Sequence, residues 1–162
     1  MKSFIAILIL GVSLLSYAAE INLSTLAKWY NPPSSKVTIG ADGLVTITAN
    51  TADRKANGYQ KAQAILPLKA EEIQAKTMEL SFKYRTEKLN GAVQVAIREG
   101  CGKIGNYHGA KLKKWDVSKE WKEYKHTFKT RKDTKELAFY IVGYYMKENE
   151  KVEIKDLKLV IK

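Results

Sequence analysis

The sequence predicts an all-β protein, an antiparallel β-sandwich or jelly roll, preceded by a removable leader. Two observations predict this fold class. Apolar and polar residues alternate over most of the chain beyond the leader, and clusters of turn-forming residues separate the alternating segments. Only one segment has the pattern of a helix. About nine short strands with almost no helix are typical of sandwiches and jelly rolls.

The first eighteen residues have the pattern of a signal peptide. Lys2 precedes an apolar run over Phe4–Leu15, and small residues follow it. Cleavage after Ala18 places another small residue, Ser16, at position −3, so residues 1–18 are the predicted leader. The apolar run is shorter than the ~20 residues that span a bilayer. We therefore expect a secreted or periplasmic protein with no membrane span.

The remaining residues, 19–162, have a length that suits one domain with a core of its own. The single cysteine, Cys101, cannot form an internal disulfide, and a tolerated free thiol is the expectation. The chain is basic, with a net charge of +11. An exported protein rarely meets nucleic acid, so a polyanionic polysaccharide, an anionic lipid or an acidic protein surface is a better candidate for its binding partner. The alternative is that the positive charge serves only solubility.

Strands are predicted wherever apolar residues recur with a period of two. The clearest case is Thr77–Arg85, where Met78, Leu80, Phe82 and Tyr84 share one face. The other segments with strand character are Ile21–Tyr30, Val37–Ile39, Leu44–Ala49, Gly58–Leu66, Gly91–Arg98, Trp121–Thr130, Leu137–Tyr145 and Val152–Ile161.

Two further elements are predicted from local patterns. Leu68–Lys76 follows a proline and has acidic residues in its first turn, which favours a short helix. In the last strand, Val152 and Ile154 are out of step with Leu157 and the apolar positions after it. One extra residue at Lys155–Asp156 restores the alternation, and this is the pattern of a β-bulge.

The motifs with catalytic or cofactor chemistry are weak. Gly100–Gly105 matches the dinucleotide-binding fingerprint, but the following residues do not open the helix that would hold a pyrophosphate, so a glycine-rich loop is expected. His126 falls on the apolar face of its strand, and His108 lies in the glycine-rich segment. These residues do not form a metal-ligand or nucleophile pattern. We expect no metal, no cofactor and no catalytic residues.

The strand near residue 140 is the most informative. If Leu137, Phe139 and Ile141 face the core, the opposite face carries Tyr140 and Tyr144 and no charge. A solvent-facing strand is normally polar there, so either a loop covers this face or it is a platform for a ligand. Tyrosine suits sugars, because its ring stacks on a pyranose and its hydroxyl bonds at the rim. Gln94 and Arg98 would contribute hydrogen bonds if their strand were the neighbour.

Basic residues are also organised. Lys119, Lys125, Lys129 and Arg131 share one face of a predicted strand and its continuation, and the lysines Lys111, Lys113 and Lys114 precede it. A solvated strand face is one interpretation. An anion-binding stripe, with Lys125, Lys129 and Arg131 as ligand-binding residues, is the other.

The C-terminal part resembles a known family. Trp121–Phe128 has the pattern Trp-x-x-Tyr-x-x-x-Phe, an apolar strand follows at Leu137–Ile141, and Val152–Leu159, near the C-terminus, contains Ile-Lys-Asp-Leu. Upstream, Met78–Phe82 follows a Leu-Pro turn at Leu66–Pro67. This order is similar to that of carbohydrate-binding modules of families 4, 9 and 22, which have a galactose-binding-like jelly roll.

The resemblance implies a domain that binds a polysaccharide or a cell-surface glycan through aromatic and polar residues in a cleft on one sheet. It also implies a structural calcium near an Asp-Asp pair in many members. Here the first of these positions is Lys155 and only Asp156 remains, which argues against such a site. The ligand residues of the family vary too much to be transferred by pattern.

Two other classes of function remain open. Polysaccharide lyases on a related jelly roll have faint counterparts in Arg85–Glu87, Gln94–Ala96 and Tyr140–Tyr145, but Ala96 stands where a histidine is needed. A cell-surface sandwich that binds proteins or serves in adhesion is the other class. The sequence favours a secreted, non-catalytic carbohydrate-binding domain, with an anionic polysaccharide as the preferred ligand.

Overall fold

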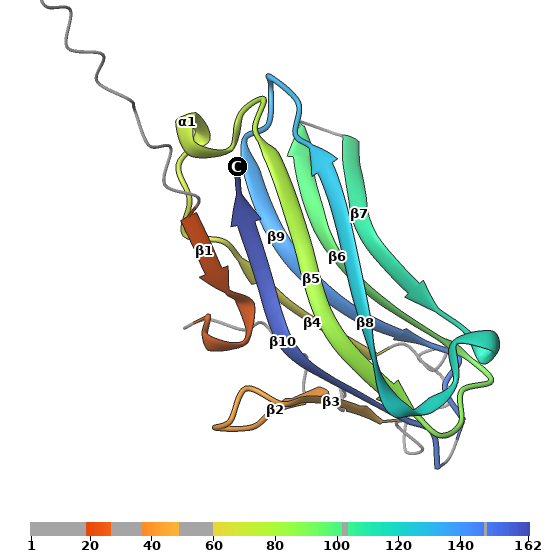
Figure 1. Ribbon diagram of the computed structural model, residues 1–162. Helices are drawn as coiled ribbons and strands as arrows, with labels where there is room; N and C mark the ends of the chain where they lie inside the picture. The colour runs from red at the N-terminus through yellow and green to blue at the C-terminus, as the bar shows by residue number, and fades with distance from the viewer. Residues whose placement is uncertain (1–18, 27–36, 49–59, 102–103, 148) are drawn as a thin grey trace, which may run out of the picture.

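The computed structural model describes residues 19–26, 37–48, 60–101, 104–147 and 149–162, which form two antiparallel sheets packed face to face (Figure 1). The predicted all-β sandwich is confirmed. The predicted leader, the predicted turn at residues 31–35 and the side chain of Cys101 lie outside the described residues. No helix in the described ranges is long and apolar enough to cross a membrane.

One sheet has six strands and the other has four. The six-stranded sheet has the order β2 (Val37–Ile39), β3 (Val45–Thr48), β10 (Lys151–Ile161), β5 (Thr77–Thr86) and β8 (Ser118–Lys129), and β1 (Ala19–Asn22) also pairs with β10. The four-stranded sheet has the order β4 (Gln60–Ile65), β9 (Glu136–Tyr144), β6 (Ala92–Cys101) and β7 (Ile104–Leu112).

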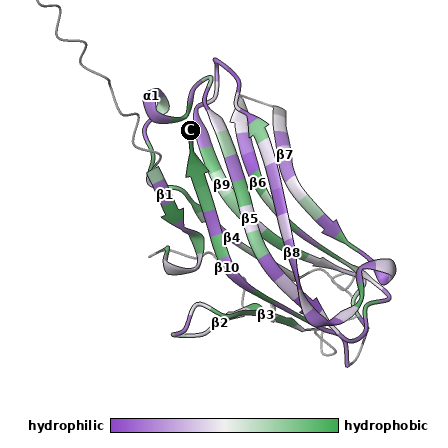
Figure 2. Cartoon of the chain, in the orientation of Figure 1, coloured by the Kyte–Doolittle hydropathy of each residue, from purple (hydrophilic) through white to green (hydrophobic). Residues whose placement is uncertain are grey.

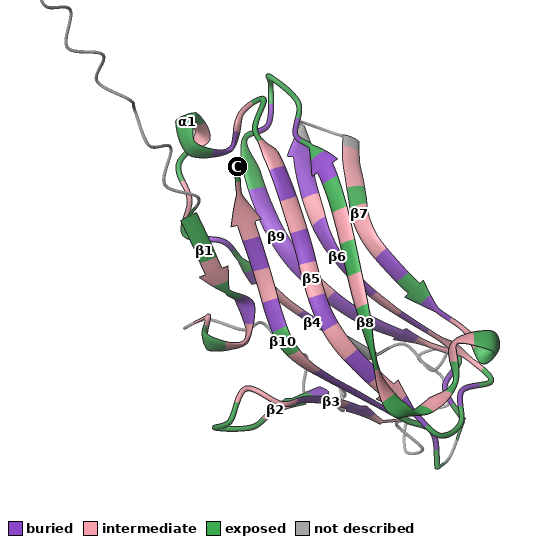
Figure 3. Cartoon of the chain, viewed as in Figure 1, coloured by how far each residue is buried: buried purple, intermediate pink, exposed green. Residues whose placement is uncertain are grey.

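The core fills the space between the sheets. Along β5 every second residue is buried, as Figure 3 shows, and hydrophobic residues alternate with hydrophilic ones in Figure 2. Phe82 of β5 and Phe139 of β9 are the largest fully buried side chains. Burying a side chain of this size contributes about 1.5–3 kcal/mol, so the alternation decides which face of each strand turns inward.

The predicted short helix and the predicted bulge are both present. The helix α1 spans Ala70–Ile73, and Glu72 accepts a hydrogen bond from the backbone N–H of Lys69 at 2.7 Å. In β10 the pairing with β5 shifts between Lys155 and Lys158, and Asp156 has a φ of 54°. The bulge divides β10, so that its first part pairs with β3 and its second part with β1 on the same edge.

The structure differs from the sequence prediction at the glycine-rich segment. Instead of a loop, Ile104–Leu112 is a tenth strand, β7, paired with β6 so that Gly109 lies opposite Ala96. Gly109 has a φ of 156°, and a Cβ there would lie 2.1 Å from the Val95 carbonyl oxygen. This close pairing requires glycine at position 109, so a residue type that is typical of loops is needed here for the strands to pair.

Aromatic stacking joins the two sheets where β7 and β8 approach each other. The ring of His108 stacks on Phe128 with centroids 4.2 Å apart and an interplanar angle of 6°. His126 lies on the core side of β8, as its alternation predicted, with its ring beside those of Tyr124 and Phe128.

A buried carboxylate holds the turn between β8 and β9. Glu99, fully buried, accepts hydrogen bonds from the backbone N–H of Arg131 at 2.6 Å and from the hydroxyl of Thr134. Its other oxygen lies 3.0 Å from His108 Nε2 and 3.5 Å from the amide of Asn106. Burial raises the pKa of Glu99, but these hydrogen bonds outweigh it and lower the pKa to about 2.

Candidate functional site

The outer face of the four-stranded sheet carries four of the residues singled out from the sequence. In the pairing of β6 with β9, Val95 lies opposite Ile141 and both point into the core. The intervening residues therefore point outward, namely Gln94 and Arg98 on β6 and Tyr140 and Tyr144 on β9. The structure thus makes β6 the neighbour of β9 and brings these four side chains to one face. We call it the tyrosine face.

Direct contacts connect these residues. The hydroxyl of Tyr144 donates a hydrogen bond to Gln94 Oε1 at 2.8 Å. The Arg98 guanidinium lies 3.5 Å from Glu136 Oε1. Gly105 leaves room for this guanidinium, because a Cβ there would lie 2.9 Å from Arg98 Nε. The polar groups of the face are therefore held in place at the level of the tyrosine rings.

Strand β7 adds Tyr107, which the sequence prediction missed, and Lys111, which it had grouped with the basic residues and not with the tyrosines. Tyr107 meets Tyr140 edge to face, with ring centroids 5.9 Å apart, and is 52% exposed. The Lys111 ammonium lies 5.2 Å from the centre of the Tyr144 ring. The signal was present in the sequence, since Tyr107 and Lys111 alternate with the inward residues Ala110 and Leu112. The expectation of a loop concealed it.

The uncharged face is covered in part. Small side chains on it are buried, with Val142 only 3% exposed. Tyr140 and Tyr144 are half-buried, and Tyr107 is largely exposed. The face is therefore neither fully covered nor flat, and the tyrosine rings form its accessible part.

The basic residues of the other prediction lie elsewhere. Lys125 and Lys129 are on the outer face of the six-stranded sheet, on the opposite side of the sandwich from the tyrosines. Lys125 pairs with Glu123 at 3.0 Å, and Arg131 pairs with Asp133 at 2.9 Å. Other cations of this sheet also have acidic partners, in the pairs Lys83–Asp156, Lys158–Glu20 and Lys162–Glu79. This pattern favours a solvated, ion-paired face.

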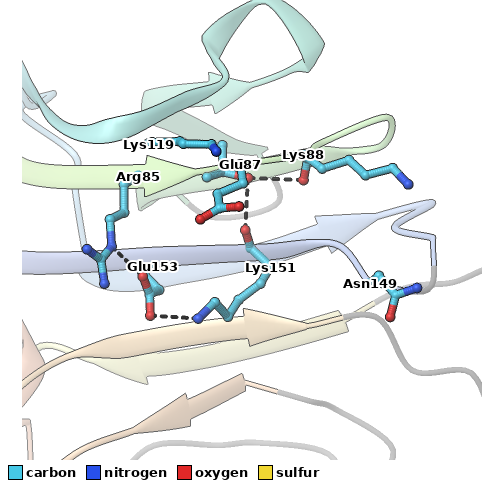
Figure 4. A pocket seen from close by; sticks show the side chains of 8 residues that line it. Arg85, Glu87, Lys88, Lys119, Asn149, Lys151 and Glu153 are labelled. Carbon is cyan, nitrogen blue, oxygen red and sulfur yellow. Dashed lines mark hydrogen bonds and ion pairs between the residues drawn. The ribbon is translucent and has the colours of Figure 1, made fainter.

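One end of the six-stranded sheet has a hollow of 360 Å³, seen in Figure 4. Two of its cations, Arg85 and Lys151, bond to Glu153 at 2.5 Å and 3.0 Å, and its lining also includes Lys88, Lys119 and a second acid, Glu87. The hydrogen bond from Arg85 holds the pKa of Glu153 below its usual range. Because Glu153 already engages two of the four cations and Glu87 adds a second negative charge, an anion in this hollow would compete with two carboxylates.

At the position that the resemblance associates with calcium, the described side chains have other partners. The Lys155 ammonium lies 4.2 Å from the centre of the Trp121 ring, and Asp156 pairs with Lys83 at 3.0 Å. In the part of the chain that the structure describes, no group of three or more His, Cys, Asp or Glu side chains is arranged to hold a metal ion.

Similar solved structures share the fold. They include the xylan-binding domain CBM22-1 of Paenibacillus barcinonensis Xyn10C (TM-score 0.52, 10% identity, 82% of this chain and 85% of that one). A second is a family 16 carbohydrate-binding module (TM-score 0.51, 12% identity, 74% and 77%). A third is a CBM4 structure (TM-score 0.50, 15% identity, 83% and 86%). No protein-family model and no curated protein matches the sequence. The jelly-roll fold implied by the resemblance is confirmed.

Proposed function

We propose that this chain is an exported, non-catalytic carbohydrate-binding domain and that the tyrosine face is its binding surface. One observation carries the proposal: Tyr107, Tyr140 and Tyr144 lie on one sheet face beside the hydrogen-bonding groups of Gln94 and Arg98. Rings that stack on a pyranose and polar groups that bond its hydroxyls are the two components of a sugar site. The pattern of residues 1–18 supports export, and the similar structures support the choice of fold for this role.

The spacing of the rings suits an oligosaccharide. Tyr140 and Tyr144 are four residues apart on β9, which corresponds to ~13 Å at the rise of a strand, or two to three sugar rings. Tyr107 extends the row sideways, because its strand lies on the far side of β6 from β9. A glycan chain on this face would therefore contact residues of three strands.

The described part of the same face does not carry the pair of groups that hydrolyses a glycosidic bond. Hydrolysis uses two carboxyl groups on either side of that bond. Among the described outward residues of the four strands, Glu136 is the single carboxylate, and it is paired with Arg98. Ala96, at the position that a lyase would give to histidine, is fully buried. We therefore infer binding without cleavage.

An anionic polysaccharide is the preferred ligand. The chain has a net charge of +11, and the face carries Arg98 and Lys111 against one carboxylate. A glycan with carboxylate or sulfate groups would gain charge-assisted hydrogen bonds from these two cations.

A glycan array with the purified protein, followed by calorimetric titration of the best ligand, tests the proposal. Tyr107→Ala, Tyr140→Ala and Tyr144→Ala are each expected to weaken binding by about 1–3 kcal/mol, because stacking area is lost. Trp121→Ala, an aromatic change on the opposite sheet, is the matched control and should bind normally. Thermal unfolding of each variant confirms that it is folded.

The result distinguishes the alternatives. Normal affinity in all three folded tyrosine variants would refute the tyrosine face as the binding surface. Unfolding of the Tyr140 and Tyr144 variants would make these residues part of the core. An array without any bound glycan would favour a protein-binding sandwich, and new unsaturated ends in a polyuronate incubated with the protein would show a lyase.

A further inference from the structure

A second pocket opens at one end of the tyrosine face. It has a volume of 430 Å³ and is formed by three segments, residues 90–92, 111–115 and 144–145. Tyr144 belongs both to this pocket and to the tyrosine face, so the two are continuous. A volume of this order lies within the range of small-ligand sites. We call it the basic pocket.

The charged residues that line the basic pocket are all positive. Its described lining contains Lys111, Lys113 and Lys114 and no Asp or Glu. The nearby carboxylate of Asp116 accepts the backbone N–H of Lys113 at 2.8 Å. In the hollow on the other sheet, by contrast, two carboxylates lie among the cations, and Glu153 accepts hydrogen bonds from two of them. An anion entering the basic pocket would therefore meet ammonium groups that no carboxylate of the described lining competes for.

Two of these ammonium groups lie over aromatic rings. Lys113 Nζ lies 4.8 Å from the centre of the Trp115 ring, as Lys111 Nζ lies over Tyr144. A cation over a ring face is attracted to it, which limits the freedom of an otherwise flexible lysine. Trp115 is 65% exposed and Tyr145 is 72% exposed, so much of both rings remains open to a ligand.

The backbone of the pocket is firmly held. Buried Glu150 accepts the backbone N–H of Asn90 at 3.0 Å and that of Gly91 at 3.3 Å. A Cβ on Gly91 would lie 2.3 Å from the Tyr144 carbonyl oxygen, so glycine lets this wall pack against β9. Tyr145 has a φ of 53°, a left-handed conformation that is unfavourable for a bulky residue. The exposed Tyr145 ring is therefore carried by a backbone conformation that is unfavourable for a large side chain.

From this arrangement we propose that the basic pocket is the subsite for an acidic sugar residue, one that carries a carboxylate or a sulfate group. The sugar ring contacts Trp115 or Tyr145, and its anionic group binds the ammonium groups of Lys113 and Lys114. The inference rests on the proposed function, since the rest of the glycan would continue along the tyrosine face from Tyr144.

Calorimetric titration with matched ligands tests the inference. The first pair is an oligogalacturonate and its fully methyl-esterified form, which keeps the rings and removes the charge. The second pair is a sulfated galactan oligosaccharide and its desulfated form, so the two pairs distinguish a carboxylate from a sulfate. We expect the intact protein to bind one acidic member at least tenfold more tightly than its neutral counterpart, with a preference that declines as salt increases.

Variants of the pocket lysines test whether the preference for the acidic ligand comes from the basic pocket. Lys113→Gln combined with Lys114→Gln should weaken the acidic ligand at least about 10-fold, because the loss of even one charge-assisted hydrogen bond is worth about a factor of ten or more, and should leave the neutral ligand unchanged. Lys132→Gln combined with Lys135→Gln removes the same charge from exposed positions in the turn between β8 and β9 and should change neither ligand. Thermal unfolding shows whether both double variants are folded.

Each outcome decides between the two proposals. Equal affinity for acidic and neutral ligands, or an acidic preference that persists in the Lys113 and Lys114 variant, overturns the acidic subsite while Tyr140→Ala still tests the tyrosine face. Failure of all four oligosaccharides to bind overturns the subsite as well, and the glycan array then decides whether the proposed function also fails.

Discussion

Replacing the buried Glu99 by Gln is expected to destabilise the protein at neutral pH far more than the same change at the surface. The glutamine side chain has the shape of the protonated acid, so the substitution removes the charge and leaves the packing nearly unchanged. The charge matters because four donor groups surround the carboxylate, from Arg131, Thr134, Asn106 and His108.

The expected magnitude follows from the pKa. Burial raises the pKa of Glu99, but the hydrogen bonds lower it by more, and the net pKa falls from the usual 4.5 to about 2. One pKa unit corresponds to 1.36 kcal/mol, so the ionised form stabilises the fold by about 3 kcal/mol. For a domain of this size, that loss lowers the melting temperature by about 10 °C.

The pH dependence has a definite sign. Between about pH 2 and 4.5 the unfolded chain binds a proton at Glu99 that the folded protein does not, so stability rises with pH. The stabilisation is complete above pH 4.5 and is lost as the pH falls through the folded pKa of about 2. The difference in free energy of unfolding between the natural protein and Glu99→Gln should therefore be largest at pH 7 and vanish near pH 2.

Urea denaturation of both proteins at a series of pH values from 7 to 2 measures this difference. Other carboxylates titrate in both proteins and cancel in the comparison. Glu123→Gln, an exposed carboxylate paired with Lys125, is the control and should change stability by no more than about 0.5 kcal/mol. A Glu99→Gln variant as stable as the natural protein at pH 7, or a difference that stays constant down to pH 2, would refute the argument.

Three further outcomes are expected. Gly109→Ala should lower the free energy of unfolding by about 2 kcal/mol or more in urea denaturation, because its Cβ would lie 2.1 Å from the Val95 carbonyl oxygen; an unchanged midpoint would contradict this. A chelator should change the melting temperature little, since Lys155 occupies a family carboxylate position, whereas a calcium-dependent rise of several degrees would show that other oxygens hold a metal. Mass spectrometry of the exported protein should find its N-terminus at Ala19 or Glu20, and an intact Met1 would exclude cleavage of the leader.

The sequence by itself determined which side of most strands faces the core. The pattern located eight of the ten described strands, including the face of β9 that carries Tyr140 and Tyr144, and the change of phase at Lys155–Asp156 located the bulge in β10. These features are local, because a strand places successive side chains on opposite faces wherever it lies in a sheet. The strand predicted over Ile21–Tyr30 was largely wrong, because β1 ends at Asn22 and Leu23–Thr25 is a 3-10 helix.

The order of the strands was decided only by the tertiary structure. Periodicity does not say which strands pair, so the position of Gln94 beside Tyr144 was conditional on β6 being the neighbour of β9. It likewise could not place Lys125 and Lys129 on the opposite sheet. Strand β7 was not predicted because its segment is rich in glycine, which is typical of loops. Only the pairing of Gly109 with Ala96 shows why glycine is needed there. Tyr107 and Lys111, and with them the basic pocket, emerge once that pairing is known, because long-range packing and not local pattern brings three segments of the chain together.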